Sequence, residues 1–153
     1  MTKIATATAT SEELGPLAKR VYAFVETQRE ILARGVKQDS DWEPLTQFID
    51  PDRFLRVGAY LEQLDWSEYK TFLTGWMAGG TKFEFTEFQI SEVGNSVFQE
   101  IEERHWRGEQ FIRKNVIAVY KFDENQRLVH LDIYEQAKDS GDWIRESASA
   151  AMA

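Results

Sequence analysis

The sequence predicts one α+β domain in which three N-terminal helices are followed by a bent antiparallel sheet. Apolar residues recur at helical spacing as far as Gly79-Gly80, and from Thr81 onward they alternate with polar residues at the period of a strand. Helices grouped before strands are typical of the α+β class. We therefore expect a cone-shaped barrel, in which the bent sheet wraps around the helices and forms a pocket for a small molecule.

The helices are predicted from their capping and stop signals. Asp39 or Ser40 is expected to cap the second helix and Asp65 the third, because these side chains accept hydrogen bonds from the first turn. The third helix carries an aromatic stripe that predicts packing in the core rather than a cofactor site. The stripe consists of Trp66, Tyr69, Phe72 and Trp76. We expect helices over residues 11–34, 40–49 and 66–78.

Four strands are predicted in a meander after the third helix. The phase of alternation slips near Thr86-Glu87, which indicates a β-bulge that bends a long strand. Gly94-Asn95 is a hairpin signal. A further short strand is possible over residues 54–60, before the third helix. The four strands are expected from residue 81 to this hairpin and over residues 97–106, 111–122 and 128–135.

Composition excludes several classes of function. The chain has 153 residues, no cysteine and a net charge of −8, so a disulfide framework, a thiolate nucleophile and nucleic acid as a partner are not expected. No apolar run approaches the roughly 20 residues of a membrane span, so we expect no membrane association and a cytoplasmic protein. Residues 1–10 are expected to be disordered, residues 11–138 to form the domain, and residues 139–153 to be a flexible tail.

The last predicted strand carries the most suggestive polar residues. His130, Asp132 and Tyr134 share one face, and the other face is apolar. If the polar face points into the cone, burial raises the pKa of a carboxyl group and lowers that of an imidazole, which suits acid–base chemistry near neutral pH. The alternative is a half-buried strand whose polar face meets water, and periodicity alone favours this alternative.

The strand over residues 97–106 is polar on both faces. Glu100, Glu102, Arg104 and Trp106 share one face, while the other carries Gln99, Glu103 and His105. An arginine between carboxylates is either a clamp in an active site or part of a surface ion-pair ladder, and the count of charges favours the ladder. Both this strand and the last are central in such a sheet, so Arg104 and Asp132 could meet across it.

Other common site chemistries find no support in the sequence. Two histidines without cysteines form no ligand cluster, so we expect no metal. No serine has the context of a nucleophile elbow, and no glycine-rich phosphate loop is present. We expect no organic cofactor either.

The last two strands resemble those of a known superfamily. With three helices before them, the residues from Phe122 to Tyr134 are similar to the nuclear transport factor 2-like superfamily, in particular its SnoaL-like polyketide cyclases and limonene-epoxide-hydrolase-like enzymes. The resemblance extends over residues 14–137. SnoaL-like cyclases often end in a His-Trp-Asp-like strand with a catalytic aspartate. The match to His130-Leu131-Asp132 implies that Asp132 is an acid/base residue and that the polar face points inward.

The second branch of the resemblance matches less completely. Limonene-epoxide-hydrolase-like enzymes use an Asp-Arg-Asp arrangement, to which Arg104 and Asp132 correspond. Trp106 stands where the Arg-x-Asp strand requires the other aspartate. Epoxide opening needs one group to activate water and another to protonate the leaving oxygen. The tryptophan removes one of these two groups, so we do not expect epoxide hydrolysis.

These observations lead to a functional hypothesis. We expect a cofactor-independent acid/base enzyme (an isomerase, dehydratase or cyclase) acting on an apolar, oxygenated ring compound, aromatic or polycyclic. Asp132, Arg104 and His130 would be catalytic, and the residues contacting the substrate would be Trp106, Tyr134, Tyr120 and Glu102. The alternatives are a non-catalytic binding or dimerising module and an accessory subunit of an oxygenase. The strand at residues 116–120 is apolar on both faces, which predicts a homodimer through the outer face of the sheet.

Overall fold

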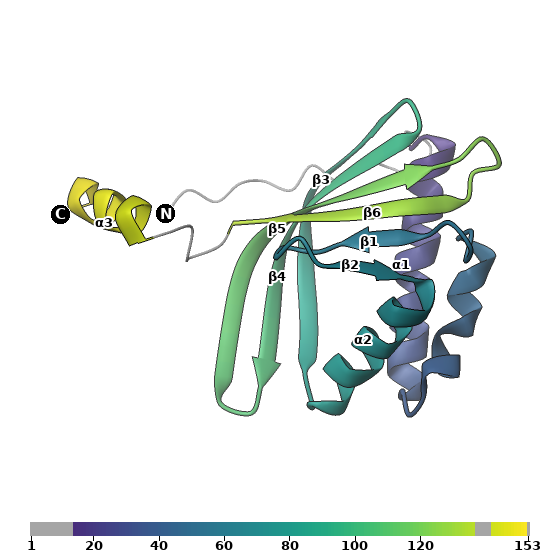
Figure 1. Cartoon of the computed structure of the whole chain (residues 1–153), viewed down its shortest axis with the longest axis horizontal. Helices are drawn as coiled ribbons and strands as arrows, with labels where there is room; N and C mark the ends of the chain where they lie inside the picture. The colour runs from purple at the N-terminus through teal and green to yellow at the C-terminus, as the bar shows by residue number, and fades with distance from the viewer. Residues whose placement is uncertain (1–13, 137–141, 153) are drawn as a thin grey trace.

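The computed structural model describes residues 14–136 and 142–152, and its main body is a bent sheet wrapped around helices (Figure 1). The six strands lie in the order β2-β1-β6-β5-β4-β3, in a mixed sheet that does not close into a barrel. The predicted α+β cone is confirmed. The elements are α1 (Pro16–Arg34), η1 (Asp39–Gln47), β1 (Leu55–Val57), β2 (Gln63–Asp65), α2 (Trp66–Ala78), β3 (Lys82–Val93), β4 (Ser96–Arg107), β5 (Gln110–Phe122), β6 (Leu128–Glu135) and α3 (Asp142–Ala151).

Two features of the sheet go beyond the prediction of four antiparallel strands. β1 lies within the segment predicted as a short strand and pairs in parallel with β6, so the sheet is mixed. β2, which the sequence analysis does not predict, pairs antiparallel with β1 and leads directly into α2. Together they extend the sheet beyond β6 and place the loop at residues 58–62 beside the mouth of the cone.

The helix ends confirm one predicted cap and correct another. Asp65 accepts a hydrogen bond from the Glu68 amide at 2.8 Å, and Glu68 accepts one from the Asp65 amide at 3.1 Å, so α2 begins with a capping box. The helix η1 is of the 3-10 type, and neither Asp39 nor Ser40 caps it. Asp41 instead accepts hydrogen bonds from the two amides that precede the helix, at 2.8 and 3.1 Å. The prediction of disorder for residues 1–10 lies outside the described residues, and α3 falls within the predicted tail.

The bend of the sheet originates where the sequence places it. The pairing of β3 with β4 shifts register between Glu87 and Gln89, which confirms the predicted bulge. The two hairpins, at residues 94–95 and 108–109, turn through Gly94 and Gly108, both with φ of +59°. The long strands β3, β4 and β5 thus curve together and present a concave inner face to α1 and α2 (Figure 1).

The core lies between the helices and this inner face. α1 contributes Val21 and Phe24, and η1 contributes Trp42 and Leu45, all of them buried. The inner face of the sheet contributes Val97, Ala118, Tyr120 and Leu131. No helix in the described part of the chain is long and apolar enough to cross a membrane.

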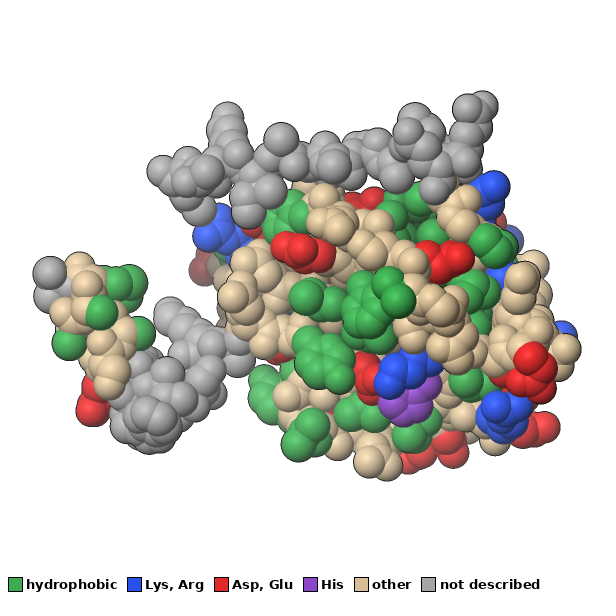
Figure 2. All heavy atoms as spheres, turned by 90° about the horizontal axis from the view of Figure 1, so that it is seen from above, with side chains coloured by type: hydrophobic (Ala, Val, Ile, Leu, Met, Phe, Trp, Pro, Cys, Tyr) green, Lys and Arg blue, Asp and Glu red, His purple; other side chains and the backbone are tan. Residues whose placement is uncertain are grey.

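The outer face of the sheet mixes apolar and charged side chains, and hydrophobic groups gather over it (Figure 2). Phe98 on β4, Ile117 on β5 and Tyr134 on β6 are large and exposed there. Ile117 lies directly opposite Tyr134 in the register of β5 and β6. We call these three residues the outer apolar patch.

Candidate functional site

A cavity of about 780 Å³ opens inside the cone, between α1, α2, the inner face of the sheet and the loop at residues 58–62. Its volume lies within the usual range for small-molecule sites. Its wall includes a group of aromatic residues, which are Phe24, Trp42, Tyr60, Tyr69, Phe72, Trp76, Phe83, Phe85 and Tyr120. The aromatic stripe of α2 is therefore only partly core: Trp66 and Tyr69 are buried there, while Phe72 and Trp76 line the cavity, as Tyr69 also does.

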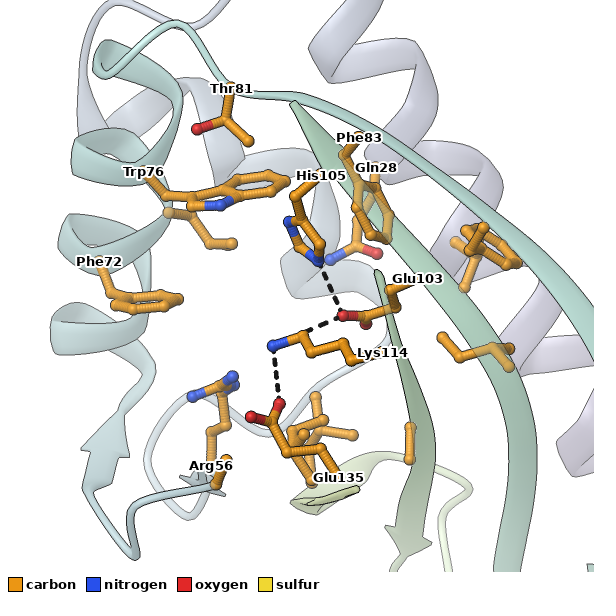
Figure 3. Close-up of a pocket in the computed structure, with 18 of the residues that line it drawn as sticks. Gln28, Arg56, Phe72, Trp76, Thr81, Phe83, Glu103, His105, Lys114 and Glu135 are labelled. Carbon is orange, nitrogen blue, oxygen red and sulfur yellow. Dashed lines mark hydrogen bonds and ion pairs between the residues drawn. The ribbon is translucent and has the colours of Figure 1, made fainter. Parts of the chain in front are cut away.

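Four charged or titratable side chains form a connected chain on one side of the cavity (Figure 3). His105 Nε2 lies 3.0 Å from Glu103 Oε2. Lys114 Nζ lies 3.9 Å from the same Glu103 oxygen and 2.7 Å from Glu135 Oε2. All four side chains are at least two-thirds buried, so these contacts are only weakly screened by solvent.

Strand alternation explains why these side chains point inward. Val97 and Ile101 on β4 are buried against the helices, and Glu103 and His105 continue the same face of the strand. Lys114 on β5 is paired directly with Glu103 in the register. The inward face of β4 is thus mainly apolar near Val97 and becomes charged toward its other end, where Glu103 and His105 line the cavity.

Aromatic rings hold the imidazole in place. The His105 ring lies 5.0 Å from the Phe83 ring and 5.8 Å from the Trp76 ring, centroid to centroid. The imidazole is thus packed between two apolar walls, with one nitrogen bonded to the Glu103 carboxylate. A paired imidazole and carboxylate in such a setting can accept and return a proton.

Two buried tyrosines add hydrogen-bond donors to the cavity. Burial raises the pKa of Tyr69 and of Tyr120, so both hydroxyls stay protonated at neutral pH. Tyr120 donates to Gln99 Oε1 at a long 3.4 Å. Tyr69 interacts with the side chains of Gln28 and Arg56. A tyrosine hydroxyl that lines a cavity can donate to an oxygen of a bound molecule.

The predicted polar face of the last strand points away from the cavity. β6 lines the cavity with Leu131, Ile133 and Glu135, which share the opposite parity from Asp132. Asp132 instead lies on the outer face, where His130 Nδ1 is 3.1 Å and Lys121 Nζ 3.3 Å from its carboxylate. Tyr134 is exposed on the same face. The expected inward orientation is wrong, so the geometry does not support catalytic roles for these three predicted residues.

The predicted residues of β4 also belong to the outer face. Arg104 borders the cavity, but its Nη1 donates to Glu102 at 2.9 Å and to Thr86 on β3 at 3.1 Å. This ion pair corresponds to the ladder among the two interpretations, but its two side chains are only 23% and 24% exposed. Trp106 packs on Phe111, with ring centroids 5.2 Å apart. Arg104 and Asp132 do not meet, and Tyr120 is the predicted substrate-binding residue that faces the cavity.

A sequence signal for the missed residues does exist. Val97 and Ile101 mark the buried parity of β4, and the polar residues at the end of that parity are Glu103 and His105. In the same way, Leu131 and Ile133 mark the inward parity of β6, and Glu135 is the polar residue at the end of that parity. Within residues 14–136 and 142–152 no group of three His, Cys, Asp or Glu is arranged to hold a metal ion.

Solved structures share this architecture at low sequence identity. The pinacolase BvnE from Penicillium brevicompactum superposes with a TM-score of 0.64 and 12% identity, covering 88% of this chain and 96% of its own. A protein assigned as a SnoaL-like polyketide cyclase from Shewanella putrefaciens CN-32 gives 0.62 and 12%, covering 92% and 100%. An LEH-like epoxide hydrolase of M. tuberculosis gives 0.57 and 17%, covering 88% and 98%.

Sequence comparison adds nothing to these structural matches. No protein-family model matches the chain, and no curated protein matches it. Identities of 12–17% establish a shared fold and not a shared reaction. The chain therefore has the nuclear transport factor 2-like fold, which it shares with these SnoaL-like and LEH-like structures.

Proposed function

We propose that this protein is an enzyme that moves a proton at a carbon atom of an apolar, oxygenated ring compound, as in isomerisation, dehydration or cyclisation. The observation that carries the proposal is the Glu103–His105 pair, held at 3.0 Å inside an aromatic cavity. A carboxylate and an imidazole in contact can pass a proton between them.

The roles follow from position. Glu103 would take a proton from the substrate, and His105 would accept or return it through Nε2. Lys114 lies between Glu103 and Glu135 and offsets their negative charge. The hydroxyls of Tyr69 and Tyr120 would donate hydrogen bonds to a substrate oxygen on which charge develops.

The substrate class follows from the walls of the cavity. The rings on α2 and β3 would bury a flat, apolar skeleton, and the polar groups would orient its oxygen atoms. Structural neighbours include proteins described as polyketide cyclases and a pinacolase, which is consistent with ring compounds as substrates.

The experiment measures exchange of carbon-bound hydrogen with solvent, because this step precedes each of the three reactions. Cyclic ketones such as tetralones and decalones are incubated with the protein in D2O, and the gain in mass is followed over time. We expect Glu103→Gln to slow exchange by roughly 10²-fold or more, because the proton acceptor is lost. We expect Asp132→Asn, the matched control on the outer face, to keep the wild-type rate.

The result distinguishes the two carboxylates. Unchanged exchange in Glu103→Gln would refute the proposed roles. Loss of exchange in Asp132→Asn alone would restore the role that the resemblance implies for that residue.

One observation favours a second candidate, a non-catalytic binding module. Glu103 and Glu135 are already paired with Lys114, as in a wall that only needs its charges balanced. A module of this kind would bind apolar ring compounds, show no catalysed exchange and keep its affinity in Glu103→Gln.

A further inference from the structure

We propose that the ligand of this cavity carries a carboxylate on its ring skeleton, and that Arg56 binds it. The inference rests on the proposed function, since it concerns the same cavity. Arg56 lies on β1 at the mouth of the cavity, and its side chain is only 13% exposed. A cation so far removed from water needs an anion nearby.

The existing partner of Arg56 is weak. Arg56 Nη1 lies 3.4 Å from Glu62 Oε1, longer than an ordinary charge-assisted hydrogen bond. The other oxygen of Glu62 accepts the Tyr60 amide at 2.9 Å, so this carboxylate mainly closes the turn between β1 and β2. Glu62 is also 36% exposed, and water competes for it.

Two aromatic rings orient the guanidinium. Its central carbon lies 5.3 Å from the centroid of Tyr69 and 5.1 Å from that of Phe72. Contact with rings occupies the faces of a guanidinium, so a planar, two-oxygen partner would bind its N–H edge, where Tyr69 and, through a long contact, Glu62 are the present neighbours. Figure 3 shows Arg56 extending into the cavity, across from the His105–Glu103 pair.

The other basic side chains of the inner wall are either more fully engaged or more exposed to water. Lys114 has two carboxylates, whereas Arg29 is excluded for another reason: its side chain is 57% exposed, so water already solvates its charge. Arg107 donates twice to the Thr81 hydroxyl and once to a carbonyl at the end of α2. Among the described residues, Arg56 is therefore the cavity cation best placed to receive an anion. A ligand held there would direct its rings toward Trp76 and Phe83.

The test compares two probes of equal shape, 2-naphthoate and its neutral analogue 2-naphthamide, by isothermal titration calorimetry. We expect the wild type to bind the carboxylate at least tenfold more tightly than the amide. Arg56→Gln is expected to remove this preference. Arg56→Lys is expected to keep part of it, because lysine retains the positive charge but lacks the planar pair of N–H donors of a guanidinium. Glu62→Gln is expected to tighten carboxylate binding alone, because it removes the competing anion.

The controls separate this inference from the proposed function. Arg107→Gln should keep the preference, and Glu103→Gln should keep it while losing proton exchange. Equal affinities of the wild type for the two probes, no binding of either, or a preference that survives in a folded Arg56→Gln would overturn the inference. None of these results depends on the outcome of the exchange assay.

Discussion

At the scale of single residues, the buried hydroxyl of Tyr120 links the cavity to the stability of the fold. Burial raises its pKa above the ordinary value of 10.0. Above pH 10 the unfolded chain therefore loses this proton while the folded chain keeps it, so the stabilisation is complete below pH 10 and declines as the pH rises toward the folded pKa. The loss is about 1.4 kcal/mol per pH unit for such a group.

We therefore predict that Tyr120→Phe weakens the alkaline loss of stability. Urea unfolding at pH 8 and pH 11 should show a smaller drop in the free energy of unfolding for the variant than for the wild type. At pH 8 the variant should be less stable by about 1 kcal/mol, because the hydrogen bond to Gln99 is lost. A difference between the two proteins that stays constant with pH would contradict the assignment.

Which residues reach the cavity could be predicted only in part from the sequence. Alternation on β6 favours a wet polar face, and the structure places His130 and Asp132 on the outer face of the sheet. The short His-x-Asp match favours the opposite orientation, and it misleads because three residues of shared sequence do not determine parity. The parity of β6 is instead determined by Leu131, because its burial in the core fixes which side of the strand faces the helices.

At the scale of elements, the capping box of Asp65 fixes where α2 begins and so places the aromatic wall of the cavity. We predict that Asp65→Ala lowers the free energy of unfolding by about 1 kcal/mol, because the Glu68 amide loses its acceptor. Urea unfolding at neutral pH checks this. Asp65→Ser keeps a capping oxygen and should lose much less stability. Equal stability of the alanine variant and the wild type would exclude the cap as a source of stability.

Elements with strong local signals were predictable, and those that depend on tertiary pairing were not. The bulge at Glu87 follows from a slip in the apolar-polar alternation of a few residues. The hairpin at Gly94 follows from the positive φ angle that glycine adopts easily. β2 has only three residues, too few for their alternation to predict a strand, and it pairs with the edge that β1 offers. For the same reason the parallel pairing of β1 with β6 could not be foreseen, since no local pattern encodes it.

At the scale of the whole molecule, the open sheet leaves its outer face uncovered by the helices of the cone. The outer apolar patch places Phe98, Ile117 and Tyr134 on three adjacent strands, with 41%, 41% and 62% of their surfaces exposed. A patch shared by adjacent strands can meet its own copy across a two-fold axis. The predicted homodimer through this face stays a prediction, and the geometry supplies residues with which to test it.

We predict that the wild type has the mass of a dimer at micromolar concentration and that Ile117→Lys has the mass of a monomer, because a charge at the centre of the patch would have to be buried unpaired in the dimer. Light scattering after size-exclusion chromatography measures both. Ile112→Lys is the matched control, since Ile112 lies on the same strand and is 58% exposed but borders the cavity. It should remain dimeric. A monomeric wild type, or a dimer that Ile117→Lys leaves intact, would show that the two cones do not associate through this face.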